Sequence, residues 1–352
     1  MDNKKGEALS YLLPLSMQRL GSVSDVLAGV SRPERYLFYG LDYFHARGVS
    51  VFDNVTLANK NGLGLVDTLI CQAYHRVIGW IGGYAGSIEW VWPFRRYLRE
   101  TAAWFVFSDR LIFPLLFMRR IGLVPKRPII LIPMGLPEKL AQVKNPTLLR
   151  QYVRDLNQLE RIICVSAHEA DCLRKDYGLV VPMRFVQTGV DTEYFCPQTV
   201  PLRVDVLSIG ADPFRDFQTL VNAARMLPGH TFRVIGSKKL LEGLRDAPMN
   251  MEMIGEIPML DLREEIAACH MLALPVREND FSGATTVLLQ AMAMGKPVIA
   301  NRVASNISGY DFENGKNCLF VKPGDASELA AVIRRVRSDE DYRRKIGHSA
   351  RE

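Results

Sequence analysis

The most informative stretch of the chain runs from Asp280 to Ala300 and reads DFSGATTVLLQAMAMGKPVIA. Leu274-Pro275 before it and Pro297 to Ala300 at its end are typical of the ends of buried strands. Between them, Thr286 to Met294 carries apolar residues at helical spacing, and Gly295 is a helix stop. The stretch therefore predicts a strand, a loop, a helix and a second strand in succession.

The loop before this predicted helix consists of small residues. Ser282 and Gly283 come first, and Ala284, Thr285 and Thr286 lead into the helix. Backbone N–H groups at the start of a helix lack helical partners, and the helix dipole favours negative charge there. The loop therefore predicts an anion site that suits a diphosphate. The alternative is a buried strand-helix-strand unit without a ligand.

The order of residues from Ser282 to Ile299 resembles the signature of the retaining glycosyltransferases of family 4. Gly283, an apolar run, Gln290, Ala-Met-Ala, Gly295 and Pro-Val-Ile follow one another as in that family. Further upstream, Gly189-Val190-Asp191 followed by Phe195 is similar to the end of the family's first domain. The resemblance covers most of residues 100–350. It implies an α/β fold with two Rossmann-like doubly wound domains that face a cleft, the GT-B architecture.

Two positions depart from the family pattern. Ser282 stands where the family has its first glutamate, which contacts the donor sugar, and Gln290 stands where it has the second, which binds the ribose. An amide still offers one donor and one acceptor, although a neutral hydrogen bond contributes roughly 0.5–1.5 kcal/mol against roughly 1.5–3 for one to a charged group. Glu278 and Asp280 lie just upstream and are placed to substitute for the first acid.

Bulk properties agree with two globular domains. The chain has 352 residues, of which 48% are apolar and 23% charged, enough for two cores of ordinary size. Its six cysteines form no CxxC pair, so free thiols in a reducing cytoplasm are expected rather than disulfides or a metal site. No secretory signal and no apolar segment of membrane-spanning length is visible in the sequence.

The proposed domain boundary follows from the resemblance and from proline. Residues 1–191 are expected to form an acceptor-binding Rossmann-like domain, residues 192–203 a linker marked by Pro197 and Pro201, and residues 204–352 a nucleotide-sugar-binding Rossmann-like domain. The net charge of +6 is uneven: residues 1–190 carry 24 Lys and Arg against 16 Asp and Glu, and the remainder 20 against 22. This asymmetry predicts an anionic partner for the first domain.

Apolar runs and helix signals predict the remaining elements. Strands are expected at Leu9–Leu15, Val49–Phe52, Trp104–Phe107, Pro128–Ile132, Arg161–Ser166, Val204–Gly210, Phe232–Gly236, Met251–Ile254 and His270–Pro275. Helices are expected at Glu34–Arg47, Asp109–Ile121, Leu148–Glu160, Ala167–Tyr177, Asp212–Met226, Leu260–Cys269 and Ala326–Val336, and from Glu340 onward.

The resemblance places the donor site in the second domain. Arg215, Lys238 and Ser282 are the expected catalytic groups, the first two because the family places basic residues there to neutralise the donor diphosphate. The expected substrate-binding residues are Gly210, Asp212, Gly255, Glu256, Ile257, Asp280, Gly283, Ala284, Thr285, Thr286 and Gln290. The alternatives are that Arg215 pairs with Asp212 or Asp216 at the surface and that Lys238 is a solvated surface lysine.

Aromatic and basic residues interleave from Trp90 to Arg99. This pattern is typical of an interfacial segment on an anionic membrane. It also fits a buried helix whose arginines line a solvated face, and both interpretations stay open. Nucleic acid is not expected as a partner, because no known binding module accompanies the charge.

Together these features predict a retaining hexosyltransferase that takes a sugar from a nucleoside-diphosphate sugar to a lipid-linked or glycan acceptor, in cell-surface polysaccharide or glycolipid synthesis. The resemblance implies no cofactor and no metal. We expect a cytoplasmic protein, peripheral on the inner face of the cytoplasmic membrane. The alternative is a catalytically weak GT-B protein that acts as a nucleotide-sugar-binding or partner subunit, which the neutral Ser282 and Gln290 favour.

Overall fold

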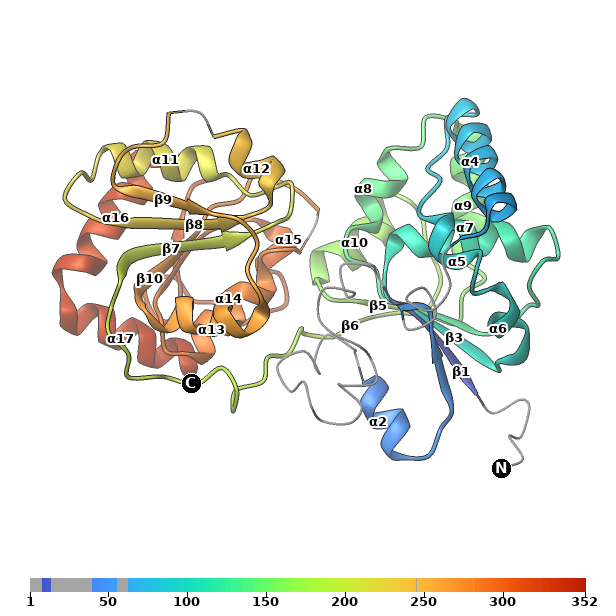
Figure 1. Cartoon of the computed structure of the whole chain (residues 1–352), viewed down its shortest axis with the longest axis horizontal. Helices are drawn as coiled ribbons and strands as arrows, with labels where there is room; N and C mark the ends of the chain where they lie inside the picture. The colour runs from blue at the N-terminus through green and yellow to red at the C-terminus, as the bar shows by residue number, and fades with distance from the viewer. Residues whose placement is uncertain (1–7, 14–39, 56–62, 245, 281) are drawn as a thin grey trace. The chain divides into compact units, whose positions relative to one another are not determined.

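The chain divides into two compact units, Met1–Val186 and Gln187–Glu352. The computed structural model describes residues 8–13, 40–55, 63–244, 246–280 and 282–352. Each unit contains a six-stranded sheet in which every pairing between strands is parallel, with helices packed against it (Figure 1). The units divide between Val186 and Gln187, so the segment 192–203, expected as a linker, belongs to the second unit.

The sheet of the first unit has the strand order β2-β1-β3-β4-β5-β6. Its strands are β1 (Leu9–Leu12), β2 (Val51–Asp53), β3 (Ala103–Val106), β4 (Ile129–Leu131), β5 (Arg161–Cys164) and β6 (Met183–Phe185). Its helices are α2 (Leu41–Ala46), α4 (Leu65–Trp80), α5 (Ile88–Val91), α6 (Arg95–Glu100), α7 (Asp109–Arg120), α8 (Leu136–Ala141), α9 (Pro146–Leu156) and α10 (Ala167–Lys175).

Two apolar clusters hold the first unit together. The larger one joins Trp104, Val106 and Leu131 of the sheet to α4, α5, α7 and α9. The smaller one contains Tyr11 and Phe107, whose rings stack at 5.1 Å, and packs with α2 on the other face (Figure 1). Alternate residues of a strand point to opposite faces, so a strand buried on both sides contributes to both clusters.

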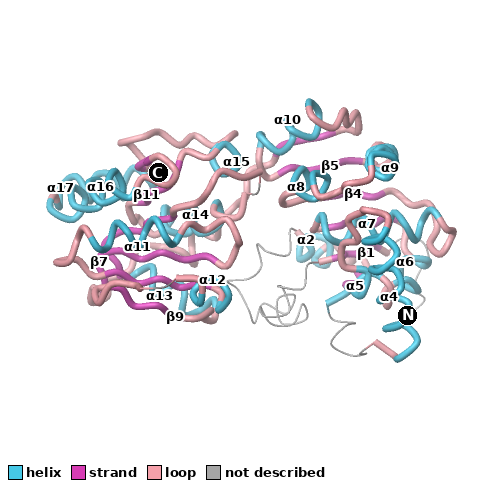
Figure 2. The backbone as a smooth tube through the Cα atoms, turned by 90° about the horizontal axis from the view of Figure 1, so that it is seen from above, coloured by secondary structure: helices cyan, strands magenta, loops and turns pink. Residues whose placement is uncertain are grey.

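The sheet of the second unit has the order β12-β11-β10-β7-β8-β9. Its strands are β7 (Val204–Gly210), β8 (Phe232–Gly236), β9 (Met251–Ile254), β10 (Cys269–Leu274), β11 (Val298–Asn301) and β12 (Leu319–Val321). Its helices are α11 (Phe217–Arg225), α12 (Lys238–Glu242), α13 (Met259–Ala267), α14 (Thr285–Ala293), α15 (Ala304–Ile307), α16 (Ala326–Ser338) and α17 (Glu340–Arg351). Helices flank this sheet on both sides (Figure 2).

The order of the second sheet defines where a ligand would bind. Counted along the chain from β7, it is the Rossmann order, in which the direction of strand addition reverses between β7 and β10. In open sheets of this kind, ligands bind outside the carboxyl ends of the strands at the reversal point. The loops that follow Gly210 and Leu274 lie there.

Most expected elements are present, and some bounds differ. β7, β8 and β9 have the expected limits. The helix expected from Asp212 begins only at Phe217, because Asp216 is its N-cap residue and its carboxylate accepts from Thr219 N at 3.2 Å. The expected helix Glu34–Arg47 is seen as α2 within the described part, and residues 34–39 lie outside it, as do residues 14 and 15 of the first expected strand. The long helix α4 was not among the helices expected from the sequence.

The membrane interpretation of Trp90 to Arg99 is wrong for Trp92 and Phe94, and Trp90 is half-buried against the core of the first unit. Trp92 and Phe94 are buried and belong to the core of the first unit, and Tyr97 stacks on Phe94 at 5.4 Å. Arg95 packs over the Trp92 ring and pairs with Asp67, while Arg96 and Arg99 are exposed. The segment is therefore a core element with arginines on its solvated side.

Candidate functional site

The loops after β7 and β10 are joined by backbone hydrogen bonds. Asp216 N–H donates to Pro275 O at 2.9 Å, and Arg277 N–H donates to Phe214 O at 2.9 Å. Between them, Arg215 and Val276 form an antiparallel bridge. The loops after β7 and β10, which the sequence analysis assigned to phosphate binding, are therefore held together as one assembly.

Arg215 lies inside this assembly. Its side chain is 1% exposed, and Nε lies 2.7 Å from Oδ2 of Asp212, which is itself mostly buried. Burial lowers the pKa of the Arg215 guanidinium, and the Asp212 carboxylate opposes that shift. The Nη1 atom is buried and has no hydrogen-bond partner among the described residues. A buried guanidinium nitrogen without a partner costs free energy, so the site has an unused donor.

Gly210 makes room for this guanidinium. A Cβ built on Gly210 would lie 1.9 Å from Arg215 Nε, well inside contact distance. Any other residue at the end of β7 would therefore displace Arg215. The glycine is required here because of this close approach.

The start of α14 forms the second part of the site. Ala284 is the N-cap residue, and its N–H donates to Asn306 Oδ1 at 3.2 Å. The Thr285 hydroxyl donates to Asn306 O at 3.3 Å. Ser282, Gly283 and Thr286 remain half-buried around this terminus. The helix therefore begins where the sequence predicts an anion site, and α15 fixes its first turn.

Three asparagines near this loop were missed from the sequence. Asn301, at the end of β11, accepts from Val276 N at 2.7 Å and donates to Val321 O at 3.1 Å. Asn306 holds α14 as described, and Asn279 accepts from the Ser305 hydroxyl at 3.4 Å. A polar residue that ends an apolar strand run, as Asn301 does, was the available signal.

The other expected residues lie in different surroundings. Gln290 is on the buried side of α14, 1% exposed, and Asp280 is half-buried. Gly255 and Glu256 are exposed and Ile257 is half-buried, all after the edge strand β9. Lys238 opens α12, its side chain is 88% exposed, and Nζ lies 3.7 Å from Glu242 Oε1. The solvated-lysine alternative therefore describes Lys238 in this structure.

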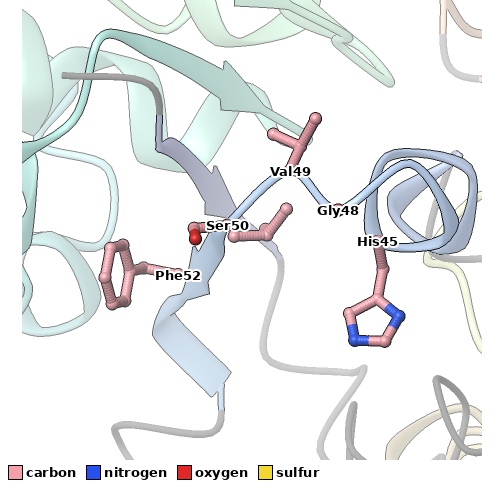
Figure 3. A pocket seen from close by; sticks show the side chains of 6 residues that line it. His45, Gly48, Val49, Ser50 and Phe52 are labelled. Carbon is pink, nitrogen blue, oxygen red and sulfur yellow. The ribbon is translucent and has the colours of Figure 1, made fainter. Parts of the chain in front are cut away.

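A hollow of about 360 Å³ on the first unit is lined by His45 and by Gly48 to Phe52 (Figure 3). It lies between α2 and the amino end of β2, the edge strand. Ligands of open parallel sheets bind at the carboxyl ends, so this hollow is not the candidate site.

Comparison with known proteins agrees with the fold. Residues 204–339 match the family Glycosyl transferases group 1. The structure resembles sucrose-phosphate synthase from Thermosynechococcus elongatus, with a TM-score of 0.70 at 17% identity over 98% of this chain and 93% of that one. It also resembles HepE from Anabaena in complex with UDP and glucose, with a TM-score of 0.63 at 16% identity over 98% and 94% of the two chains.

Two Rossmann-like units with these neighbours define a GT-B protein. The match to Glycosyl transferases group 1 lies within the second unit, and the fold of the whole chain is that of these solved structures. A mannosyltransferase, the MMP alpha-(1->4)-mannosyltransferase of Mycolicibacterium hassiacum, is 25% identical over 216 residues, or 56% of this chain. The match spans half the length of that relative.

Proposed function

We propose that the chain transfers a hexosyl residue, with retention, from a nucleoside-diphosphate sugar to a lipid-linked or glycan acceptor in cell-surface polysaccharide or glycolipid synthesis. In this proposal the second unit binds the sugar donor and the first unit binds the acceptor. The mannosyltransferase relative and the neighbour that holds UDP and glucose support a nucleotide-sugar donor. The resemblance to family 4 supports retention.

The proposal rests on Arg215 Nη1, a hydrogen-bond donor without a partner among the described residues. Nη1 is buried without a partner at the reversal point of the sheet, in the loop assembly that leads into the first turn of α14. A phosphate oxygen would satisfy that donor, and the helix terminus adds backbone N–H groups and a favourable dipole. Because the side chain is 1% exposed, contact with a diphosphate requires residues 211–216 to move when the donor binds.

The proposed chemistry depends on stabilising the leaving group. The bond between the anomeric carbon and the diphosphate oxygen breaks, a bond to the acceptor oxygen forms, and the acceptor proton passes to the diphosphate. Negative charge develops on the diphosphate in the transition state, so a positioned guanidinium and helix amides accelerate that step. Ser282 to Thr286 surround the diphosphate in this assignment, and Gln290 and the loop Gly255 to Ile257 bind the nucleoside.

A second function has its own support. Arg215 is already paired with Asp212, and Ser282 and Gln290 are neutral where the family has acids. These features favour a catalytically weak GT-B protein that binds a nucleotide sugar as a partner subunit. Such a protein would bind a donor without hydrolysing it.

Calorimetry with UDP-, GDP- and ADP-sugars tests the proposal, followed by hydrolysis of whichever sugar binds. We expect one donor to bind and to be hydrolysed slowly without an acceptor. Arg215→Ala should weaken this binding, whereas Arg233→Ala should not, because Arg233 is held on β8 by Glu252 and Glu265. Binding without hydrolysis would favour the partner subunit, and no binding across the panel would overturn both functions.

A further inference from the structure

Helix α4 of the first unit is apolar on its inner side and on its outer side. Cys71, Tyr74 and Ile78 face the core. On the outer side, large apolar side chains are more than half exposed, and the two most exposed are Trp80 at 87% and Leu65 at 79%. The others of this set are Val66, Leu69 and Val77.

These outer residues form one continuous row. Residues three or four apart lie on the same side of a helix, and Val66, Leu69, Ala73, Val77 and Trp80 follow that spacing along the whole of α4. We call these five residues the outer row. Exposed apolar side chains are common singly, whereas a contiguous patch of this length marks an interaction surface.

The charges of α4 suit an anionic partner. Its one acid, Asp67, accepts from Trp92 Nε1 at 2.6 Å and pairs with Arg95 at 3.3 Å, so it is engaged on the inner side. The exposed Arg76 lies one turn before Trp80, beside the outer row. Residues 1–190 also carry 24 Lys and Arg against 16 Asp and Glu. The partner should therefore be apolar and negatively charged at once.

We propose that α4 lies in the surface of a bilayer that contains anionic lipid, with the outer row among the upper acyl chains and Arg76 at the phosphates. A helix of 16 residues is about 24 Å long. Among the described residues, no helix is long and apolar enough to cross a membrane. Lying in the interface buries the row, and the indole of Trp80 suits that boundary because it has an apolar body and a polar N–H. This goes beyond the proposed function and does not depend on any sugar donor.

Vesicle co-sedimentation of the full chain tests the proposal. The wild type should pellet with vesicles of phosphatidylcholine and phosphatidylglycerol, and less with phosphatidylcholine alone. Val66→Ser/Leu69→Ser/Val77→Ser should lower partitioning by at least about tenfold, since each side chain loses its burial in the bilayer. Ile121→Ser/Val180→Ser is the matched control, because both residues are exposed apolar side chains of the same unit outside α4. Equal loss in both variants would overturn the proposal.

Two further variants locate the contact. Arg76→Glu should lower binding to the anionic vesicles by on the order of tenfold and leave binding to neutral ones unchanged. Brominated lipid should quench the wild-type tryptophan emission, and Trp80→Phe should remove most of that quenching, because Trp92 and Trp104 are buried and the half-buried Trp90 packs against the core. Quenching that persists in Trp80→Phe would place the contact elsewhere. The proposal would be overturned if the wild type did not bind vesicles and sedimented as a dimer that the triple Ser variant dissociates. That result would show that a second copy of the chain binds to α4.

Discussion

The Cα of Gly210 lies directly against the guanidinium of Arg215, so closely that a Cβ would fall 1.9 Å from Nε. The contact holds the end of β7 against Arg215, which lies in the loop that forms part of the proposed donor site. It also explains why a strand whose other members include Val206, Leu207 and Ile209 ends in glycine. The relationship can be tested by substitutions on both of its sides.

Gly210→Ala should displace Arg215 and weaken donor binding. The added methyl group has no space, and overpacking of this kind costs about 1–3 kcal/mol of the free energy of unfolding. Thermal unfolding and calorimetry on the same samples measure both effects. Gly229→Ala is the matched control, because a Cβ there meets nothing within 4 Å. Equal behaviour of the two variants would contradict the close contact.

Arg215→Ala should weaken binding of the nucleotide sugar by about 1.5–3 kcal/mol, the range for hydrogen bonds to a charged group. It also leaves the mostly buried Asp212 carboxylate unpaired, which destabilises the fold. Arg215→Ala/Asp212→Asn removes that unpaired charge, so its unfolding midpoint should recover while binding stays weak. If binding recovers together with stability, Arg215 has only a structural role.

Gln290→Glu tests the proposed ribose contact. A carboxylate in place of this buried amide should lower the stability of the free protein, because burial disfavours its charged form. A carboxylate accepts from both hydroxyls of a ribose diol, so bound nucleotide sugar should restore much of that loss. Unfolding followed with and without the donor measures the difference. A donor that stabilises the wild type and not this variant would place the ribose elsewhere.

Asp205 should make the second unit sensitive to acid. Burial alone would raise the pKa of Asp205, but hydrogen bonds from Thr231 and Arg337 outweigh it and hold the pKa below its usual 3.8. A carboxyl with a lowered pKa in the folded state contributes stability that is fully present above pH 3.8 and is lost as the pH falls through the folded value.

Asp205→Asn should therefore lower the free energy of unfolding at neutral pH and flatten its fall below about pH 4. Urea unfolding at a series of pH values measures this slope. Asp176→Asn, at an exposed position of the first unit, is the control and should keep the wild-type slope. An unchanged slope in Asp205→Asn would show that Asp205 does not titrate with folding.

Most strands of the second unit, and the helix that follows its small-residue loop, could be predicted from local sequence signals alone. Val204–Gly210 and Phe232–Gly236 are strands with the expected limits, because parallel strands buried on both faces appear as apolar runs. Met251–Ile254 also has the expected limits, although it is an edge strand and is only partly buried. The helix after Ser282 was also predicted to within one residue, since glycine and small residues mark its ends. These signals are local, so a single sequence contains them.

Which side chains are buried could not be predicted from the sequence and depends on the folded arrangement. It buried Arg215 against Gly210, placed Trp92 and Phe94 in the core, and left Trp80 and the rest of the outer row of α4 exposed. The composition of each segment was consistent with either outcome. Burial depends on residues far away in the chain, such as Asp67 beside Trp92 or the loop after β10 beside Arg215, and local periodicity does not encode those neighbours.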